Sequence, residues 1–376
     1  MNIGFDAKRL FNNFTGLGNY SRSLVYGLKK YFPENNYSLF TPKISDKDEV
    51  QLFVNNKDYN VVLPDMKPSS LWRSYGCTKE ITNLNLDIFH GLSHELPLGI
   101  RKTGAKPIVT IHDLIYLTYP NDFSFFDRKI YDFKFRYACN NADRIIAVSN
   151  STKNDIVRFY DISPKKIDVV YQSCHANFKN KLSDVEVDDA IKRYKLPDEF
   201  MLYVGSIIER KNLLNIVKAL NSLKNTIDVP LVVIGYGKAY LKKVKSYISE
   251  KQLQRQVIFT QNVSYKDLPA IYSKAMLFVY PSQYEGFGIP VIEALQRKTP
   301  VITSGISSLP EAAGPGAFYC NPNDEDSIAE GISKILNDSA YSRKLADEGY
   351  MYVQQFNEEH NALNLMKTYQ KVFKML

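Results

Sequence analysis

The stretch Met276-Leu-Phe-Val-Tyr280, followed by Glu285-Gly-Phe-Gly-Ile-Pro-Val-Ile-Glu293, decides the fold of this chain. Its apolar run predicts a buried parallel strand, and Pro290 is typical of the first turn of a helix. The order is therefore strand, glycine-rich loop, helix. In an open α/β sheet, a loop at the carboxyl end of a strand is where ligands bind.

Two carboxylates bracket this loop, Glu285 before it and Glu293 in what we expect to be the first turn of the helix. Gly286 and Gly288 let the backbone approach a ligand closely, and the free N–H groups of a helix start attract anions. An acid in a first turn also stabilises a helix through the macrodipole. A purely structural role for Glu293 therefore stays open.

The two glutamates, with seven residues between them inside a Glu-Gly-Phe-Gly-Ile-Pro string, resemble the signature of retaining glycosyltransferases of family 4. The resemblance implies an α/β protein of the GT-B fold, with two Rossmann-like parallel-sheet domains facing across a cleft. It also implies that Glu285 faces the transferred sugar and that Glu293 binds the ribose hydroxyls of the nucleotide. The loop residues Gly286, Phe287 and Gly288 would then contact the donor.

The length of the chain, 376 residues, suits two domains of comparable size rather than one core. We expect an N-terminal acceptor domain over residues 1–172, an interdomain connection with a short helix over 173–198 and a C-terminal nucleotide-sugar donor domain over 199–357. The resemblance implies that the last helix, residues 358–376, packs back onto the first domain.

The composition narrows the class of protein. No apolar run reaches the roughly 18 residues that a membrane span needs, and the N-terminus lacks the basic-then-apolar order of a signal peptide. Four cysteines far apart in sequence favour reduced thiols in a cytoplasmic protein. Residues 1–180 carry 24 Lys and Arg against 18 Asp and Glu, a net +6, and the rest carries 24 against 22. No nucleic-acid module accompanies this charge, so three explanations stay open: an anionic membrane, a phosphate-bearing substrate and a merely soluble surface.

Gly16 and Gly18 lie in the stretch Phe14-Thr-Gly-Leu-Gly-Asn-Tyr-Ser21, after a strand predicted over residues 2–6. We expect this stretch to be a loop before a helix that runs through about Lys30. The dinucleotide fingerprint is excluded because its third glycine is missing and the loop is too long. The resemblance implies a loop that closes over the donor diphosphate and the acceptor; a plain helix start is the alternative.

His112 ends a buried strand predicted over residues 108–111. At that place a histidine can contact a sugar hydroxyl or a leaving-group oxygen, and Asp113 can fix its tautomer or the loop. The His-Asp-Leu string resembles family 4 enzymes, in which this histidine contacts the donor sugar; a structural turn is the alternative. His90 and His94 have no spacing partner for a metal and are predicted to be structural.

Residues 123–141 are aromatic and basic and predict a helix. Four of its side chains recur at helical spacing and predict one apolar stripe that faces the core: Phe126, Ile130, Phe133 and Tyr137. Phe135 then falls on the solvated side. A membrane-facing role for this helix is the alternative.

Arg210 and Lys211 follow a predicted strand and the small residues Gly205 and Ser206, and we expect them to open a helix. Cations at a helix start oppose the dipole, and a bound diphosphate would resolve that conflict. The resemblance implies that this pair grips the donor diphosphate. Lys211 matches the family lysine, whereas Ser206 stands where the family has arginine, so Arg210 would replace it.

Asn262 and Val263 follow a strand predicted over residues 257–260, and in the family the backbone at that edge contacts the nucleobase. No Asp-x-Asp sequence is placed to bind a metal. We therefore expect no metal and no cofactor, with the nucleotide-sugar as a co-substrate.

The sequence thus predicts a retaining, metal-independent hexosyltransferase in the cytoplasm, with peripheral contact on the inner face of an anionic membrane. The Thr-Gly-Leu-Gly-Asn-Tyr and Ile-His-Asp-Leu strings resemble bacterial mannosyltransferases of surface polysaccharide assembly. They imply transfer of mannose from GDP-mannose to a glycan or a lipid-linked saccharide. Two alternatives stay open: an epimerase-like nucleotide-sugar enzyme on the same scaffold, and a non-catalytic nucleotide-sugar-binding protein.

Overall fold

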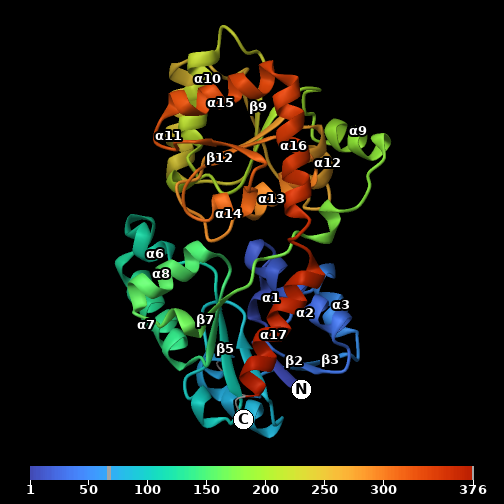
Figure 1. Ribbon diagram of the computed structural model, residues 1–376, viewed down its shortest axis with the longest axis vertical. Coiled ribbons are helices and arrows are strands. Elements are labelled where there is room, and N and C mark those ends of the chain that lie inside the picture. Colours follow the sequence, from blue (N-terminus) through green and yellow to red (C-terminus); the bar gives the residue numbers. More distant parts are fainter. Residues whose placement is uncertain (66–68, 375–376) are drawn as a thin grey trace. The chain divides into compact units, whose positions relative to one another are not determined.

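The chain folds into two compact α/β units, seen in the computed structural model of Figure 1. Unit 1 comprises residues 1–173 and 356–376, and unit 2 comprises residues 174–355. The structure describes residues 1–65 and 69–374. Residues 375 and 376, which the sequence analysis includes in the last helix, lie outside the described residues.

Unit 1 is built on a seven-stranded parallel sheet in the order β3-β2-β1-β4-β5-β6-β7. The order reverses between β1 and β4, and such a switch point is where open α/β sheets bind ligands. The strands are β1 (Asn2–Asp6), β2 (Asn36–Phe40), β3 (Tyr59–Val62), β4 (Ile88–Gly91), β5 (Lys106–Ile111), β6 (Arg144–Ala147) and β7 (Ile167–Val169).

Helices cover both faces of this sheet, as a parallel sheet requires. One apolar cluster joins β1 and β2 to α2 and α17, which pack on each other (Figure 1). A second cluster joins β4, β5 and β6 to α5, α7 and α8. The helices are α1 (Lys8–Asn12), α2 (Gly16–Tyr31), α3 (Asp48–Val54), α4 (Ser69–Leu71), α5 (Cys77–Asn83), α6 (Ile115–Thr118), α7 (Phe125–Asn141), α8 (Asn150–Tyr160) and α17 (Glu358–Phe373).

Helix α7 buries a different face from the one that the sequence predicted. Phe135, Ala138 and Cys139 are its buried residues, whereas Phe126 is 77% exposed, Ile130 51% and Phe133 60%. The prediction of a core-facing stripe was wrong. The helix is apolar on two sides, and the side with the small residues Ala138 and Cys139 packs against the sheet, where little space is available.

Unit 2 contains a six-stranded parallel sheet in the order β10-β9-β8-β11-β12-β13, which reverses between β8 and β11. Its strands are β8 (Met201–Val204), β9 (Leu231–Ile234), β10 (Val257–Thr260), β11 (Leu277–Tyr280), β12 (Val301–Ser304) and β13 (Ala317–Cys320). Its helices are α9 (Asp184–Arg193), α10 (Leu213–Leu223), α11 (Ala239–Glu250), α12 (Leu268–Lys274), α13 (Ile289–Gln296), α14 (Leu309–Ala313), α15 (Glu325–Asn337) and α16 (Ser339–Val353). Helix α9 lies in the segment that the sequence analysis assigns to the interdomain connection.

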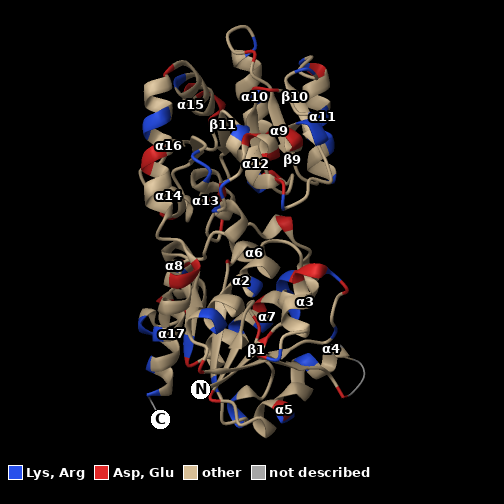
Figure 2. Cartoon of the chain, turned by 90° about the vertical axis from the view of Figure 1, so that its right-hand side faces the viewer, with Lys and Arg blue, Asp and Glu red and all other residues tan. Residues whose placement is uncertain are grey.

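The surface charge, the cysteines and the apolar character of the helices can be compared with what the composition predicted. Figure 2 shows Lys and Arg interspersed with Asp and Glu over the helices of both units. All four cysteines are buried and unpaired. Within residues 1–65 and 69–374, no helix combines the length and the apolar character that crossing a bilayer demands.

Candidate functional site

The candidate site of unit 2 lies where β8 and β11 end, beside the reversal of strand order. A 3-10 turn over Glu209–Lys211 follows β8, and it is ended by Asn212 at φ +65°. The Asn212 amide donates hydrogen bonds to the carbonyl oxygens of Pro281 and Pro322 at 3.1 and 2.6 Å. One buried side chain therefore ties the turn after β8 to the loop after β11.

The carboxylate of Glu285 is the centre of this site. Its Oε1 atom lies 3.2 Å from the Lys211 Nζ atom and 3.3 Å from the Arg210 Nη1 atom. The same oxygen accepts hydrogen bonds from the hydroxyls of Tyr280 at 2.9 Å and Ser282 at 2.8 Å. Among the described residues no group donates to the other oxygen, Oε2, so one oxygen is held and one is left for a ligand.

Two opposing effects determine the charge of Glu285. Burial raises the pKa of this carboxyl, but Lys211 and then Arg210 outweigh burial and hold the pKa at about 2. Glu285 is therefore ionised at neutral pH, and its charge balances that of the cations.

The position of the two cations corrects the sequence analysis. Arg210 and Lys211 precede α10 rather than open it, because Asn212 takes the left-handed conformation and the α-helix starts at Leu213. The conflict with the helix dipole is thus absent. Glu285 compensates the cations within the chain, so their presence does not by itself demand a bound anion.

The glycine-rich loop is braced from the start of α14. The Ser308 hydroxyl contacts the carbonyl oxygens of Glu285 and Phe287 at 2.8 and 2.9 Å, and the Ser307 hydroxyl contacts that of Glu285 at 2.8 Å. Gly288 has φ +116° and caps α13; a Cβ atom there would lie 3.0 Å from Leu309 Cδ2. The loop thus needs glycine at 288 and is held in one conformation.

The small residues after β8 leave room for Lys211. Gly205 has φ +152°, and a Cβ atom there would lie 3.5 Å from the Lys211 Nζ atom. That Nζ atom also donates to the Tyr280 hydroxyl. Ser206 is exposed, and its carbonyl oxygen accepts from Tyr203 at 3.0 Å. Tyr280 and Ser282 were not predicted as site residues, because their only signal in the sequence is their place at the carboxyl end of β11.

Glu293 lies in a different environment. It is 4% exposed, and its two oxygens accept from the Tyr265 hydroxyl at 2.9 Å and the Tyr272 hydroxyl at 3.4 Å. Burial raises the pKa of Glu293 to about 7, although the two tyrosines lower it. The prediction that Glu293 sits in the first turn was wrong, because α13 begins at Ile289 and Glu293 falls in its second turn.

The loop after β10 also carries predicted residues. Asn262 has φ +58°, and its backbone N–H and its side-chain oxygen both bond the Tyr236 hydroxyl. Tyr236 is 59% exposed, and Val263 follows half-buried. The Asn262–Tyr236 pair thus presents an exposed ring beside a backbone edge.

In unit 1, His112 is buried and both its ring nitrogens are engaged. Nε2 donates to the Leu92 carbonyl oxygen at 3.0 Å, and Nδ1 accepts from the Gln172 amide at 3.2 Å. Burial, and then His94, lower the pKa of His112 to about 3, so the ring is neutral at pH 7. Asp113 accepts from the Ile115 N–H and holds the loop; the tautomer is set by Leu92 and Gln172 and not by Asp113.

The other two histidines of this region differ from each other. His90 bonds Tyr369 at 2.7 Å and Thr110 at 2.8 Å, which fits the predicted structural role. His94 is buried at φ +62°, stacks on Phe135 with ring centroids 4.3 Å apart, and lies 5.2 Å from the His112 ring. Its Nδ1 atom has no hydrogen-bond partner among the described residues.

The first glycine pair lies within a helix rather than in a loop, because α2 begins at Gly16. Gly18 is required: a Cβ atom there would come 1.7 Å from the Asn13 carbonyl oxygen, whereas one at Gly16 would meet open space. The Asn13 side chain accepts from the Gly18 N–H at 3.0 Å. This part of the loop prediction was wrong because a preceding asparagine binds N–H groups at the helix start.

The structure therefore brings together some of the predicted residues. Unit 2 joins Glu285, Arg210, Lys211 and Gly205 in one cluster, while Glu293 and Asn262 lie in separate environments of the same unit. His112, Gly16 and Gly18 belong to unit 1. Nowhere in the described parts of the chain do three or more His, Cys, Asp or Glu side chains gather as a metal site.

Two parallel-sheet units with these strand orders have the architecture of the GT-B fold. Residues 15–174 match the family described as Glycosyltransferase Family 4. Residues 184–352 match the family described as Glycosyl transferases group 1. The chain belongs to these glycosyltransferases, and the predicted fold class and family are confirmed.

Relatives and solved structures agree with this assignment. O-antigen chain mannosyltransferase B of Escherichia coli is 28% identical over 75% of this chain and 74% of its own length. O-antigen chain mannosyltransferase RfbU of Salmonella typhimurium is 31% identical over 64% of this chain and 63% of its own length. Sucrose-phosphate synthase from Thermosynechococcus elongatus has the same fold, with a TM-score of 0.81, 21% identity and complete coverage of both chains. The structure of Anabaena HepE in complex with UDP-glucose has a TM-score of 0.75 at 16% identity, over 99% of this chain and 100% of that one.

Proposed function

We propose that this chain is a retaining glycosyltransferase that moves mannose from GDP-mannose to a glycan or a lipid-linked saccharide in surface polysaccharide assembly. The two relatives described above are named as O-antigen chain mannosyltransferases, which supports the sugar and the pathway class. HepE, a fold neighbour, binds UDP-glucose, which supports a nucleotide-sugar as donor.

The observation that carries the proposal is the state of Glu285. It is an ionised carboxylate with one oxygen bound to Arg210, Lys211, Tyr280 and Ser282. Its second oxygen accepts from no described residue. An ionised carboxylate only accepts hydrogen bonds, and the hydroxyls of a sugar can donate them. Glu285 is thus suited to orient the transferred sugar.

The cations are suited to the leaving group. Arg210 and Lys211 are positioned before any ligand binds, and preorganised positive charge stabilises the negative charge that develops on a departing diphosphate. The N–H groups of the braced loop at Gly286 and Gly288 would add to this stabilisation.

The same arrangement makes Glu285 a poor nucleophile, because its charge is paired and one oxygen has four partners. We therefore propose same-face attack assisted by the leaving phosphate, the path by which the anomeric configuration is retained without a covalent intermediate on the protein. Glu293 would bind the ribose, Asn262 and Val263 the base, and His112 the sugar. Gly16, Gly18, Gly205, Ser206 and Phe287 would line the donor.

We further propose that the reaction needs no metal or other cofactor. The nucleotide-sugar enters as a co-substrate, and the two cations take the part that a metal ion has in other sugar transferases. We also propose that the protein acts in the cytoplasm, in peripheral contact with the inner face of a membrane that carries the acceptor.

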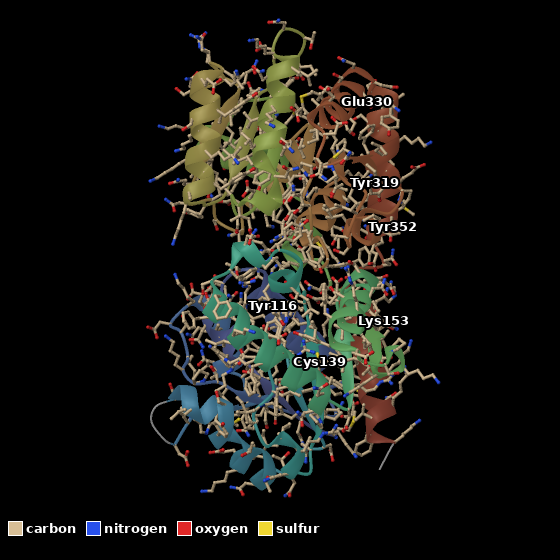
Figure 3. The ribbon with its side chains drawn as sticks, turned by 90° about the vertical axis from the view of Figure 1, so that its left-hand side faces the viewer. Tyr116, Cys139, Lys153, Tyr319, Glu330 and Tyr352 are labelled. Atoms are coloured by element: carbon tan, nitrogen blue, oxygen red, sulfur yellow. The ribbon has the colours of Figure 1, made fainter. Side chains whose placement is uncertain are left out.

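The test is a thermal-shift panel of GDP, UDP, ADP, CMP and NAD on three proteins: wild type, Glu293→Ala and Glu330→Ala. Glu330 is an exposed residue of α15, labelled in Figure 3, and serves as the matched control. GDP alone should stabilise the wild type and the control by several degrees, and Glu293→Ala should lose that shift. Transfer from GDP-mannose should then release GDP and form an α-mannoside, read by NMR at the anomeric carbon, with chelator present.

Each part of the proposal fails on a different result. Stabilisation by UDP alone would overturn the donor but keep the transferase. Stabilisation by NAD alone, or by none of the panel, would overturn the transferase. A β-mannoside would overturn the retaining mechanism, and loss of activity in chelator would overturn metal independence.

A further inference from the structure

Helix α7 carries an apolar face that no described residue of unit 1 covers. Its inner side packs through Phe135, Ala138 and Cys139, and Figure 3 views the molecule from the α7 side with Cys139 labelled. Its outer side presents Phe126, Ile130 and Phe133, each more than half exposed. Ordinary surface helices keep polar residues outside, and contiguous exposed apolar residues mark interaction surfaces.

A pocket adjoins this outer face and extends its apolar surface into unit 1. Phe133 and Tyr137 of α7 form one wall of the pocket, and Trp72 and Phe40 line it from other elements. The pocket holds about 570 Å³ including its open mouth. Charged residues line the pocket as well, among them Arg73, Glu95 and Lys134, so only its wall of Phe133 and Tyr137 continues the apolar face of α7.

One exposed cation, Lys129, flanks the apolar residues, whereas Arg128 is half-buried and its Nε atom is enclosed. The Lys129 Nζ atom and the Arg128 guanidinium lie 5.7 and 5.8 Å from the centroid of the exposed Phe125 ring. Neither forms an ion pair with an acid of the described residues. The acids of the helix are engaged: Asp127 accepts from Ser124, and Asp132 pairs with Arg136. Unit 1 as a whole has 26 Lys and Arg against 20 Asp and Glu, a net +6.

We propose that the outer face of α7 docks on the surface of a bilayer that contains anionic lipids. Phe126, Ile130 and Phe133 insert at the level of the headgroups, while the exposed Lys129 contacts lipid phosphates. Aromatic and aliphatic residues with unpaired cations beside them are the composition of helices that lie in a membrane interface. Protein–protein interfaces, in contrast, are depleted in Lys. This inference rests on the proposed peripheral contact and names the surface that makes it.

The experiment is vesicle flotation of the full chain at low salt. One set of vesicles is phosphatidylcholine alone, and the other contains about one-third phosphatidylglycerol. We expect wild type to float with the anionic vesicles, and Phe126→Ser/Phe133→Ser to lower the bound fraction by about tenfold or more. Lys129→Glu should lower it less, and high salt should weaken binding of the wild type.

The controls separate surface from fold. Tyr75→Ser removes an aromatic ring that is 57% exposed in unit 1 but outside α7, and it should bind vesicles like wild type. Thermal unfolding should show that the α7 variant stays folded, because its altered side chains are exposed.

Two results would overturn the proposal: wild type that floats with neither vesicle, or an α7 variant that binds as well as Tyr75→Ser. Concentration-dependent dimerisation in light scattering, abolished by the α7 variant and without flotation, would assign the face to a second copy instead. The assay contains no donor, so its failure leaves the proposed transfer reaction untouched, and failure of the nucleotide panel leaves this surface untouched.

Discussion

The two carboxylates that bracket the glycine-rich loop, the half-buried Glu285 and the buried Glu293, differ in charge. Glu285 faces Lys211 and Arg210, which hold its pKa at about 2. Of the described residues, the hydroxyls of Tyr265 and Tyr272 bond Glu293, and burial raises its pKa to about 7. Burial raises the pKa of both carboxyls, so their different neighbours decide the difference between them. Cations can outweigh the cost of burying a charge, and neutral hydrogen-bond donors do so only in part.

This difference gives the two groups opposite effects on stability. The pKa of Glu285 is depressed, so the stability that it contributes is present above about pH 4.5 and is lost as the pH falls toward 2. The pKa of Glu293 is raised, so the unfolded chain releases its proton first as the pH rises. Stability is therefore lost between about pH 4.5 and 7 and changes little above that. The buried carboxyl at 293 is retained at a cost in stability, which suits a binding role.

The largest expected effect comes from Glu285→Gln. The substitution leaves the buried Arg210 and the half-buried Lys211 without an anion, and it removes the acceptor proposed for the sugar. We expect the free energy of unfolding at pH 7 to fall by about 3 kcal/mol and kcat/KM to fall by about 1,000-fold. Urea unfolding and GDP release from GDP-mannose measure the two quantities.

Glu330→Gln, on the exposed face of α15, is the matched control for Glu285→Gln and should change neither quantity. Unchanged stability in Glu285→Gln would contradict the pairing of Glu285 with the two cations. Unchanged activity would contradict its contact with the sugar.

A second, opposite effect is expected for Glu293→Gln. The variant has no charge to bury, so it should be more stable than wild type by about 3 kcal/mol at pH 8, with the difference vanishing near pH 4. Its affinity for GDP-mannose should nevertheless fall by about tenfold or more, because the ribose loses an ionised acceptor. Urea unfolding across this pH range and calorimetric titration of GDP-mannose measure both. If the difference in free energy of unfolding between wild type and Glu293→Gln stays constant from pH 5 to 8, the pKa of Glu293 is not raised to about 7.

The smallest effect is expected for Tyr265→Phe, which sharpens the comparison without changing a carboxylate. The Tyr265 hydroxyl lies 2.9 Å from Glu293 and lowers its pKa, so its removal should raise that pKa by about half a unit to one unit. Because ribose hydroxyls donate to the ionised form, the Kd of GDP-mannose should fall as pH rises through 7 in wild type. In the variant the fall should occur at higher pH.

Tyr272→Phe provides a graded comparison for this prediction. The Tyr272 hydroxyl lies 3.4 Å from Glu293, so its removal should shift the pH dependence of the Kd less than removal of the Tyr265 hydroxyl does. Identical profiles for wild type and both variants would contradict the role of Glu293 in ribose binding.

Local sequence patterns predicted much of the fold and part of the candidate site. Apolar runs bounded by turns predicted the strands, and the strand–loop–helix order at Glu285 predicted a ligand-binding edge. Arg210 and Lys211 could be assigned to the same site because both they and Glu285 follow strands of one parallel sheet. In such a sheet, all carboxyl ends lie at one edge. The tyrosines around Glu293 could not be found this way, because they come from residues 265 and 272, and only packing brings them to α13.

By itself, the sequence determined the two α/β units, the glycosyltransferase family and the loop with its bracketing carboxylates. The apolar runs and short motifs that predict these features depend only on neighbours along the chain. Only the tertiary structure decided the face of α7 that is buried, the compensation of Arg210 and Lys211 by Glu285, and the charge of each glutamate. A helix apolar on two sides has two equivalent ways to pack until the sheet beneath it is present. A carboxyl likewise has no definite pKa until distant residues surround it.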